Sequence, residues 1–257
     1  MIARIGRTTL GILAGLGDFA LFTGRCFSAA PSARRPWPRI IRALHEQGAV
    51  CLPVILIVGL FTGLVLGLQG FHVLSRFGSE GLLGSLVSLS LVREMAPVLA
   101  SLMLVGQAGS ALAAELGMQR NTEQIVALET MGIDSHGYLV SPRLFSCLLT
   151  FPAQTALFVI VGLWGGALSG SLLLGVDSGV YWSAIDRSVE GRDIGECLIK
   201  ALVFGILAVG ICAYQGFHAD RDGSAGARGV GAATTRSVVL SSISILIADY
   251  VVSSFYV

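Results

Sequence analysis

The sequence predicts an all-α integral membrane protein with five membrane-spanning helices and one further amphipathic helix at the N-terminus. Of the 257 residues, 54% are hydrophobic and only 13% are charged, whereas a soluble domain carries about 25% charged residues. The mean hydropathy is +0.78. The apolar residues gather in five long runs, and a helix needs about 20 such residues to cross a bilayer. We therefore expect residues 1–257 to form a single membrane domain.

The first 30 residues predict a helix that lies in the membrane interface. Two faces repeat with helical spacing: polar or small residues at Arg4, Gly11, Asp18 and Arg25, and apolar residues at Ile5, Ile12, Leu16, Phe19 and Phe22. A signal peptide is the alternative, because Ser28, Ala29 and Ala30 resemble a cleavage site. Asp18 interrupts the apolar stretch and argues against that alternative.

Five apolar runs predict a bundle of spans over about residues 49–256. They cover Ala49–Gln69, Leu82–Leu116, Leu144–Leu174, Cys197–Phe217 and Ser237–Tyr256. Of the 17 lysine and arginine residues, twelve fall on one side of these spans and four, Lys200 among them, on the other. The positive-inside rule then places the N-terminus in the cytoplasm and the C-terminus outside. Tyr181 and Trp182, in the exterior loop, suit an interfacial aromatic belt.

Two spans contain glycines four residues apart, which allow helix backbones to approach closely in lipid. They are Gly59, Gly63 and Gly67 in the first span and Gly162, Gly166 and Gly170 in the third. The spacing fits packing within the chain, and it fits equally a homodimer seam along the first span.

The second span contains Arg93, Glu94 and Pro97. A charge inside a bilayer costs several kcal/mol on insertion scales, so an intramembrane pair predicts a functional site. Proline leaves the carbonyl four residues before it without its helical partner, and here that carbonyl belongs to Arg93. We expect a kink at the charged residues, where the helix lines a polar cavity. A purely structural ion pair is the alternative.

The loop between the second and third spans predicts a short helix over about residues 121–132. Asn121 is a good N-cap with Gln124 at the third position, Glu123 suits the first turn, and Gly132 suits the stop. Ile125, Leu128 and Met131 form an apolar face. So short a helix needs a packing surface, which is either its own bundle or a cytoplasmic partner.

Several functional classes find no support in the sequence. The five cysteines and four histidines show no metal-ligand spacing, and no catalytic triad or carboxylate dyad stands out. Lys200 is the only lysine, and Glu196 and Ala201 around it exclude a nucleotide-binding P-loop. With a net charge of +1, no basic field suggests nucleic acid. We expect no enzyme activity, metal or cofactor in this chain, and ATP with magnesium only on a partner ATPase.

The chain resembles the MlaE/YrbE permeases, the membrane subunits of ABC transporters that move phospholipid across the Gram-negative envelope. The resemblance rests on seven stretches: Gly59–Gly70, Ser90–Gly117, Arg120–Asp134, Ser141–Arg143, Gly162–Gly166, Asp177–Ile185 and Ala233–Val239. It implies an MlaE-type fold, a multi-pass place in the inner membrane, and a role in outer-membrane lipid asymmetry.

The resemblance also implies partners and sites. The partners would be a second copy of the chain, a cytoplasmic MlaF-like ABC ATPase, an MlaB-like STAS-domain subunit, a periplasmic MlaD-like hexameric MCE ring, and phospholipid. Lipid contacts are expected at Arg93, Glu94, Arg42 and Arg236. ATPase coupling is expected at Glu123, Gln124, Ile125, Leu128, Glu129 and Met131. Arginine suits phosphate because its planar fork donates two hydrogen bonds, and Glu94 would moderate the hold of Arg93 on a head group.

Two other functions compete with lipid translocation. One is a self-contained channel or secondary transporter for a small anionic or amphipathic solute, in which Glu94 or Asp249 could relay protons. Five spans without an internal repeat fit that class poorly. The other is an anchor that only holds the ring and the ATPase together, for which Arg93 would be dispensable.

Overall fold

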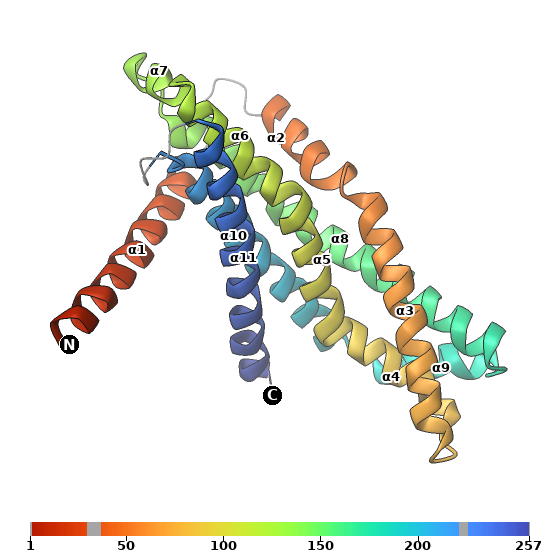
Figure 1. Cartoon of the computed structure of the whole chain (residues 1–257). Coiled ribbons are helices and arrows are strands. Elements are labelled where there is room, and N and C mark those ends of the chain that lie inside the picture. The colour runs from red at the N-terminus through yellow and green to blue at the C-terminus, as the bar shows by residue number, and fades with distance from the viewer. Residues whose placement is uncertain (1, 30–36, 221–225, 257) are drawn as a thin grey trace.

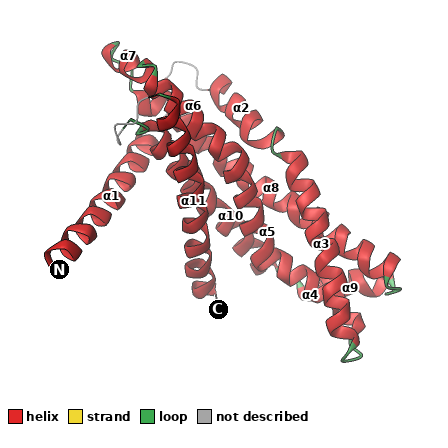
Figure 2. Cartoon of the chain, viewed as in Figure 1, coloured by secondary structure: helices red, strands yellow, loops and turns green. Residues whose placement is uncertain are grey.

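The structure, a computed structural model, describes residues 2–29, 37–220 and 226–256, and these residues contain helices and no strand (Figure 2). The α-helices are α1 (Ile2–Ser28), α2 (Trp37–Leu44), α3 (Leu52–Ser75), α4 (Leu83–Ser90), α5 (Ala96–Leu104), α6 (Ser110–Asn121), α7 (Gln124–Thr130), α8 (Ser141–Ala167), α9 (Ser178–Ser188), α10 (Gly191–Phe217) and α11 (Ala227–Tyr256). Single π-helical turns join several of them: η1 (His45–Ala49), η3 (Leu91–Met95), η4 (Val105–Gly109), η5 (His136–Val140) and η6 (Leu168–Leu173). A 3₁₀ turn, η2 (Glu80–Leu82), precedes α4.

Five helical stretches are long and apolar enough to cross a membrane, as predicted. They are Trp37–Ser75, Glu80–Asn121, His136–Leu173, Gly191–Phe217 and Ala227–Tyr256. All five start earlier than the apolar runs predicted for them. Hydropathy detects only the part of a helix that lies in hydrocarbon, whereas the helical hydrogen bonds continue into polar sequence. Figure 1 shows α7 at one end of the bundle and α9 at the other.

The N-terminal helix α1 forms as predicted and leans away from the bundle (Figure 1). It docks near its C-terminal end, where the Phe22 ring lies 5.5 Å from Tyr214 and 5.6 Å from Phe217 between centroids. Leu10 and Leu13 remain about 70% exposed, so this part of the helix has an apolar surface free for lipid. Of the predicted faces, the surroundings of Arg4, Ile5, Gly11 and Ile12 lie outside what is described, and so does Ala30 at the end of the predicted segment.

The glycine ladder of the first span packs on α8 within the same chain. Gly59, Gly63 and Gly67 are all buried. A Cβ at Gly63 would overlap the carbonyl oxygen of Gly162, and one at Gly67 would overlap the Ser169 hydroxyl. The ladder is thus a packing seam between α3 and α8. A homodimer seam on these three glycines is wrong for this structure, because α8 already covers them.

The loop between the third and fourth spans contains a helix that the sequence analysis missed. α9 begins at the N-cap Asp177, whose side chain accepts a hydrogen bond from the Val180 backbone N–H. Tyr181 is fully buried, and its hydroxyl donates to the Leu163 carbonyl at 3.1 Å. Its predicted place in an interfacial aromatic belt is therefore wrong, because the small residues around it let the ring enter the core. Trp182 is half-buried against Trp164.

Replacing Gly63 with alanine tests the α3–α8 seam. The added methyl group meets backbone rather than a flexible side chain, so the helices must separate, at a cost of about 1–3 kcal/mol or more. We expect Gly63→Ala to lower the unfolding temperature of the detergent-solubilised protein. Gly106→Ala is the matched control, because no atom lies within 4 Å of its added Cβ. Equal melting of the two variants would contradict the seam.

Candidate functional site: a buried lysine among carboxylates

The side chain of Lys200, on α10, is fully buried and surrounded by acidic groups. Its Nζ lies 3.1 Å from Glu94 on η3, 3.2 Å from Glu196 one turn earlier, and 3.4 Å from Asp249 on α11. It also donates a 2.6 Å hydrogen bond to the backbone carbonyl of Arg93. One ammonium group therefore links η3, α10 and α11.

The bond to the Arg93 carbonyl follows from Pro97. Proline has no N–H to donate to the carbonyl four residues earlier, and that carbonyl is the one Lys200 reaches. The backbone adapts by a π-helical turn over Leu91–Met95, closed by the Ala96 N–H on the Leu91 carbonyl. Such turns are frequent at functional sites. The freed carbonyl lies at Arg93 as predicted, and the irregularity there takes the form of a π-helical turn.

Arg93 and Glu94 do not pair with each other. The Nε of Arg93 donates to Asp193 at 2.8 Å, whereas Glu94 binds Lys200 and also accepts from Ser253 at 3.3 Å. Adjacent residues on a helix point about 100° apart and do not face one another. The predicted moderation of Arg93 by Glu94 is therefore wrong, and Asp193 holds the guanidinium instead.

The site is buried on one side and open on the other. The side chain of Asp193 is 5% exposed, while those of Arg93 and Glu94 are 52% and 50% exposed. Asp193 is fixed a second time, because its other oxygen accepts from the Glu190 backbone N–H in a capping box at the start of α10. Within the described ranges, the two terminal nitrogens of Arg93 have no hydrogen-bond partner. They can receive an anion.

Three members of this network were not predicted, namely Lys200, Asp193 and Glu196. Lys200 was counted with the exterior charges, because it falls in the first turn of the predicted span, which begins at Cys197. α10 begins at Gly191, which puts Lys200 well inside the helix. The four-residue spacing of Glu196 and Lys200 was an available signal, since oppositely charged residues at that spacing pair on a helix.

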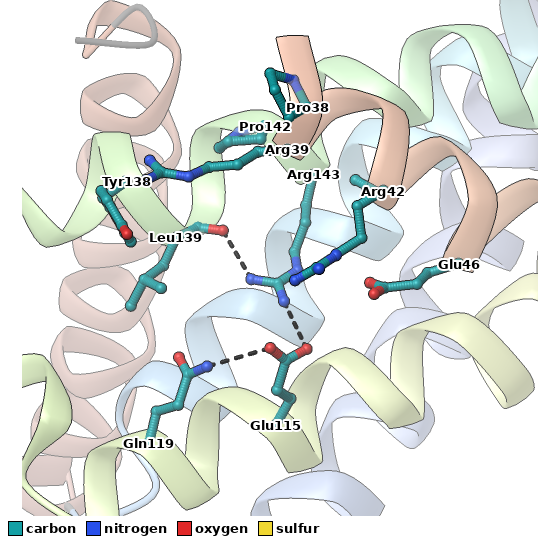
Figure 3. Close-up of a pocket in the computed structure, with 11 residues that line it drawn as sticks. Pro38, Arg39, Arg42, Glu46, Glu115, Gln119, Tyr138, Leu139, Pro142 and Arg143 are labelled. Carbon is teal, nitrogen blue, oxygen red and sulfur yellow. Dashed lines mark hydrogen bonds and ion pairs between the residues drawn. The ribbon is translucent and has the colours of Figure 1, made fainter. Parts of the chain in front are cut away.

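The other two predicted lipid contacts lie away from this network. Arg42 lines a cavity of about 400 Å³ between α2, α6 and α8, near the α7 end of the bundle (Figure 3). Arg236 is exposed on α11, 13 residues before Asp249, which is about 20 Å along a helix. The four residues predicted to contact lipid therefore do not form one site within a single chain.

The loop helix exists but starts differently from the prediction. α6 continues through Asn121, whose side chain accepts from the Gly226 N–H at 2.8 Å, so it is no N-cap and forms no capping box with Gln124. Glu123 precedes α7 with a φ of 58°, a left-handed conformation that is uncommon outside glycine. Gly132, with a φ of 74°, ends the segment as predicted.

The predicted apolar face of α7 divides between two environments. Ile125 is fully buried against the bundle and Leu128 is half-buried. Val126 and Met131 are 42% and 66% exposed. Gln124 and Glu129 are also exposed, and Glu129 accepts from the Ser135 hydroxyl at 2.8 Å. The helix is thus anchored on its own chain and presents a second apolar surface outward.

Comparison with known proteins identifies the family of this chain. The model of the permease MlaE family matches residues 40–255. The chain belongs to the MlaE permease family. The intermembrane phospholipid transport system permease protein MlaE of Haemophilus influenzae is 37% identical over 254 residues, 98% of this chain and 96% of that protein.

Further relatives come from other groups of organisms. A probable ABC transporter permease protein of Rickettsia conorii is 39% identical over 255 residues, 98% of this chain and 96% of that protein. The chloroplastic protein TRIGALACTOSYLDIACYLGLYCEROL 1 of Arabidopsis thaliana is 33% identical over 220 residues, 86% of this chain and 62% of that protein.

The stability of this MlaE-family chain should depend on Lys200. Removing one partner of a buried ion pair costs about 3–5 kcal/mol, because the remaining charges are left uncompensated. We expect Lys200→Met to lower the unfolding temperature in detergent strongly. Adding Glu196→Gln, which removes a carboxylate left behind at 10% exposure, should restore part of the loss. Wild-type melting of Lys200→Met would show that the network does not support the fold.

Proposed function

We propose that this chain is the transmembrane permease subunit of an ABC transporter that moves phospholipids between the inner and outer membranes and so maintains outer-membrane lipid asymmetry. Membership of the MlaE family and the similarity to the intermembrane phospholipid transport permease of Haemophilus influenzae support the class of transporter. The chain supplies the lipid path, and ATP hydrolysis with its magnesium belongs to a partner.

One observation supports the site of lipid contact. Arg93 is anchored to Asp193 through Nε alone, so its terminal nitrogens face the open side of the network. An oriented guanidinium offers a phosphate two parallel hydrogen bonds. The apolar surfaces of the surrounding spans suit acyl chains. A phospholipid phosphate could therefore replace water at the terminal nitrogens of Arg93, while the Nε of Arg93 keeps its hydrogen bond to Asp193.

The transporter would contain two copies of this chain, two copies of an MlaF-like ATPase with MlaB-like subunits, and an MlaD-like MCE ring on the periplasmic side. The dimer must form on surfaces other than the covered glycines, and the exposed faces of α3 and α11 are available. The basic residues at the α7 end support a cytoplasmic N-terminus and a periplasmic C-terminus. The exposed leucines of α1 support its placement in the interface.

A secondary transporter remains the second candidate, because Glu94 and Asp249 contact the same ammonium group. Carboxylates that share a buried cation can exchange a proton, which is the element such transporters use. The two candidates differ in their energy source. Transport by the purified chain driven by a pH gradient, without ATPase, would favour the second.

Neutralising Arg93 tests the lipid path. We expect Arg93→Ala to reduce ATP-driven phospholipid transfer in proteoliposomes by about tenfold or more, the loss of one or two charge-assisted hydrogen bonds. Assembly with the ATPase should be unchanged. Arg187→Gln is the control, because the hydrogen bonds of Arg187 to the described residues stay within α9. Wild-type transfer by Arg93→Ala would eliminate Arg93 as the contact and favour an anchoring role.

The outward surface of α7 should bind the ATPase. We expect Val126→Glu with Met131→Glu to abolish co-purification of the ATPase, because both side chains are exposed and a charge there cannot enter an apolar interface. The fold should survive, since Ile125 still anchors the helix. Unchanged recovery of the ATPase with the double variant would contradict this docking surface.

A further inference from the structure

Four helical segments at the α9 end of the bundle pack on one another through glycines. They are α3, α4, α9 and the part of α8 with η6 that follows Pro152, and together we call them the α9 unit. A Cβ at Gly84 of α4 would overlap the Tyr181 carbonyl of α9, and one at Gly166 of α8 would lie 2.5 Å from the Tyr181 hydroxyl. α3 meets α8 at Gly63 in the same way. Backbones that approach so closely cannot slide past one another, so the α9 unit is a rigid body.

The chain passes between the α9 unit and the rest of the bundle four times, and each crossing departs from a regular α-helix. The first crossing is η1, followed by Pro53 in the first turn of α3. The second is η3. The third is Pro152 inside α8, which leaves the Leu148 carbonyl without its helical N–H. The fourth is the extended backbone of Val189 and Glu190 between α9 and α10. Helices bend at such places, so bending points surround the unit on every connection.

One side-chain amide holds the first and third crossings together. Gln154 lies on α8 just beyond Pro152 and is 2% exposed. Its Nε2 donates to the carbonyls of Gln47 and Gly48 in η1, at 3.1 and 2.6 Å. Where a helix is interrupted inside a membrane, its carbonyls need such partners, because water cannot serve them. The amide oxygen of Gln154 has no hydrogen-bond partner among the described residues, so only the donor end of this amide is fixed.

An ion pair holds the second and fourth crossings together. Arg93 of η3 binds Asp193, in the first turn of α10, at 2.8 Å. The second oxygen of Asp193 accepts a hydrogen bond from the N–H of Glu190, which belongs to the extended connection. Arg93 therefore lies on a crossing. A tilt of the α9 unit would move η3 and with it the guanidinium group.

α10 and α11 form a frame against which the unit can tilt. Both are uninterrupted α-helices that contain no proline, and Lys200 of α10 pairs with Asp249 of α11 at 3.4 Å. Figure 1 shows α4 and α9 apart from the C-terminal end of α11. Beside the first crossing there is unfilled space, because η1, η4 and α6 line a cavity of about 260 Å³. The unit can tilt without separating α10 from α11.

We propose that the α9 unit tilts as a rigid body on these four crossings, and that Gln154 and the Arg93–Asp193 pair hold it in the position seen here. A hinge consists of a few residues that absorb a change of backbone angle between packed bodies, and the crossings supply such residues at every connection. The inference goes beyond the proposed function, because it describes a movement of this chain whichever solute the chain carries.

Two pairs of spin labels measure the tilt. Leu172→Cys with Tyr250→Cys places one label on the α9 unit and one on α11, whereas Leu172→Cys with Phe77→Cys places both on the unit. Leu172 and Phe77 are 77% exposed and Tyr250 is 78% exposed, while the five native cysteines are buried and do not compete for the label. Pulsed electron paramagnetic resonance gives the distances in nanodiscs, on the full chain with its co-purifying subunits, diluted with unlabelled chain.

Removing the amide of Gln154 should loosen the hinge. We expect Gln154→Leu to spread the Leu172–Tyr250 distances over a wider range than in wild type, because the first and third crossings are no longer tied. Thr155→Val is the matched control on the next residue of α8, since the buried Thr155 hydroxyl has no hydrogen-bond partner among the described residues. It should leave the distances unchanged.

Replacing Pro152 should stiffen the hinge. Pro152→Ala restores an N–H for the Leu148 carbonyl, so the Leu172–Tyr250 distances should narrow. Pro142→Ala is the matched control, because Pro142 lies in the first turn of α8, where a proline removes no helical hydrogen bond. This variant also tests the proposal should Gln154→Leu fail to fold.

The label pair within the unit decides whether the unit is rigid. The Leu172–Phe77 distances should keep their wild-type width in every variant. A change there as large as that of the Leu172–Tyr250 pair would overturn the proposal, and so would equal Leu172–Tyr250 distributions in wild type, Gln154→Leu and Pro152→Ala. These distances do not depend on phospholipid transfer, so failure of the hinge and failure of the proposed function are separate results.

Discussion

The ammonium group of Lys200 is the contact on which the arrangement of three spans depends. It satisfies the carbonyl that Pro97 leaves free, and it offsets carboxylates from η3, α10 and α11 at one point. In a membrane, water cannot replace such contacts, so each of these groups would be costly alone. The same lysine makes Arg93 available, because it takes Glu94 and leaves the guanidinium to Asp193.

The helices of this protein pack as transmembrane helices do, not as the helices of a soluble protein do. Because lipid tails compete with apolar side chains, close backbone approach and polar contacts hold the helices together. α3 and α8 meet through glycines, with no room for a methyl group at Gly63. α10 and α11 meet through the Lys200–Asp249 pair and the contact between Cys212 and Ser241. The large apolar side chains of α3 and α11 are left to face outward.

The charged groups form two separate systems at different depths. The Lys200 network lies where η3 meets the first turns of α10 and the last turns of α11, whereas the arginines of α2 and α8 line the cavity near α7. α6 connects the second system to α7, and its end is tied to the start of α11 by the Asn121–Gly226 hydrogen bond. α11 thus contacts α6 at one end and Lys200 near the other.

The sequence by itself determined the five spans, the short loop helix and the disturbance at Arg93, because hydrophobic length and proline chemistry are local properties. It did not determine which side chains contact one another. Lys200 looked exterior, because an apolar run cannot reveal that a helix begins six residues earlier, at Gly191. The Gly59–Gly67 ladder fitted two partners equally until α8 was seen to cover it. Arg93 and Glu94 were adjacent in sequence yet turned to different helices, since a helix separates neighbouring side chains by about 100°. Which groups meet depends on how the spans are placed side by side, and only the tertiary structure decides that.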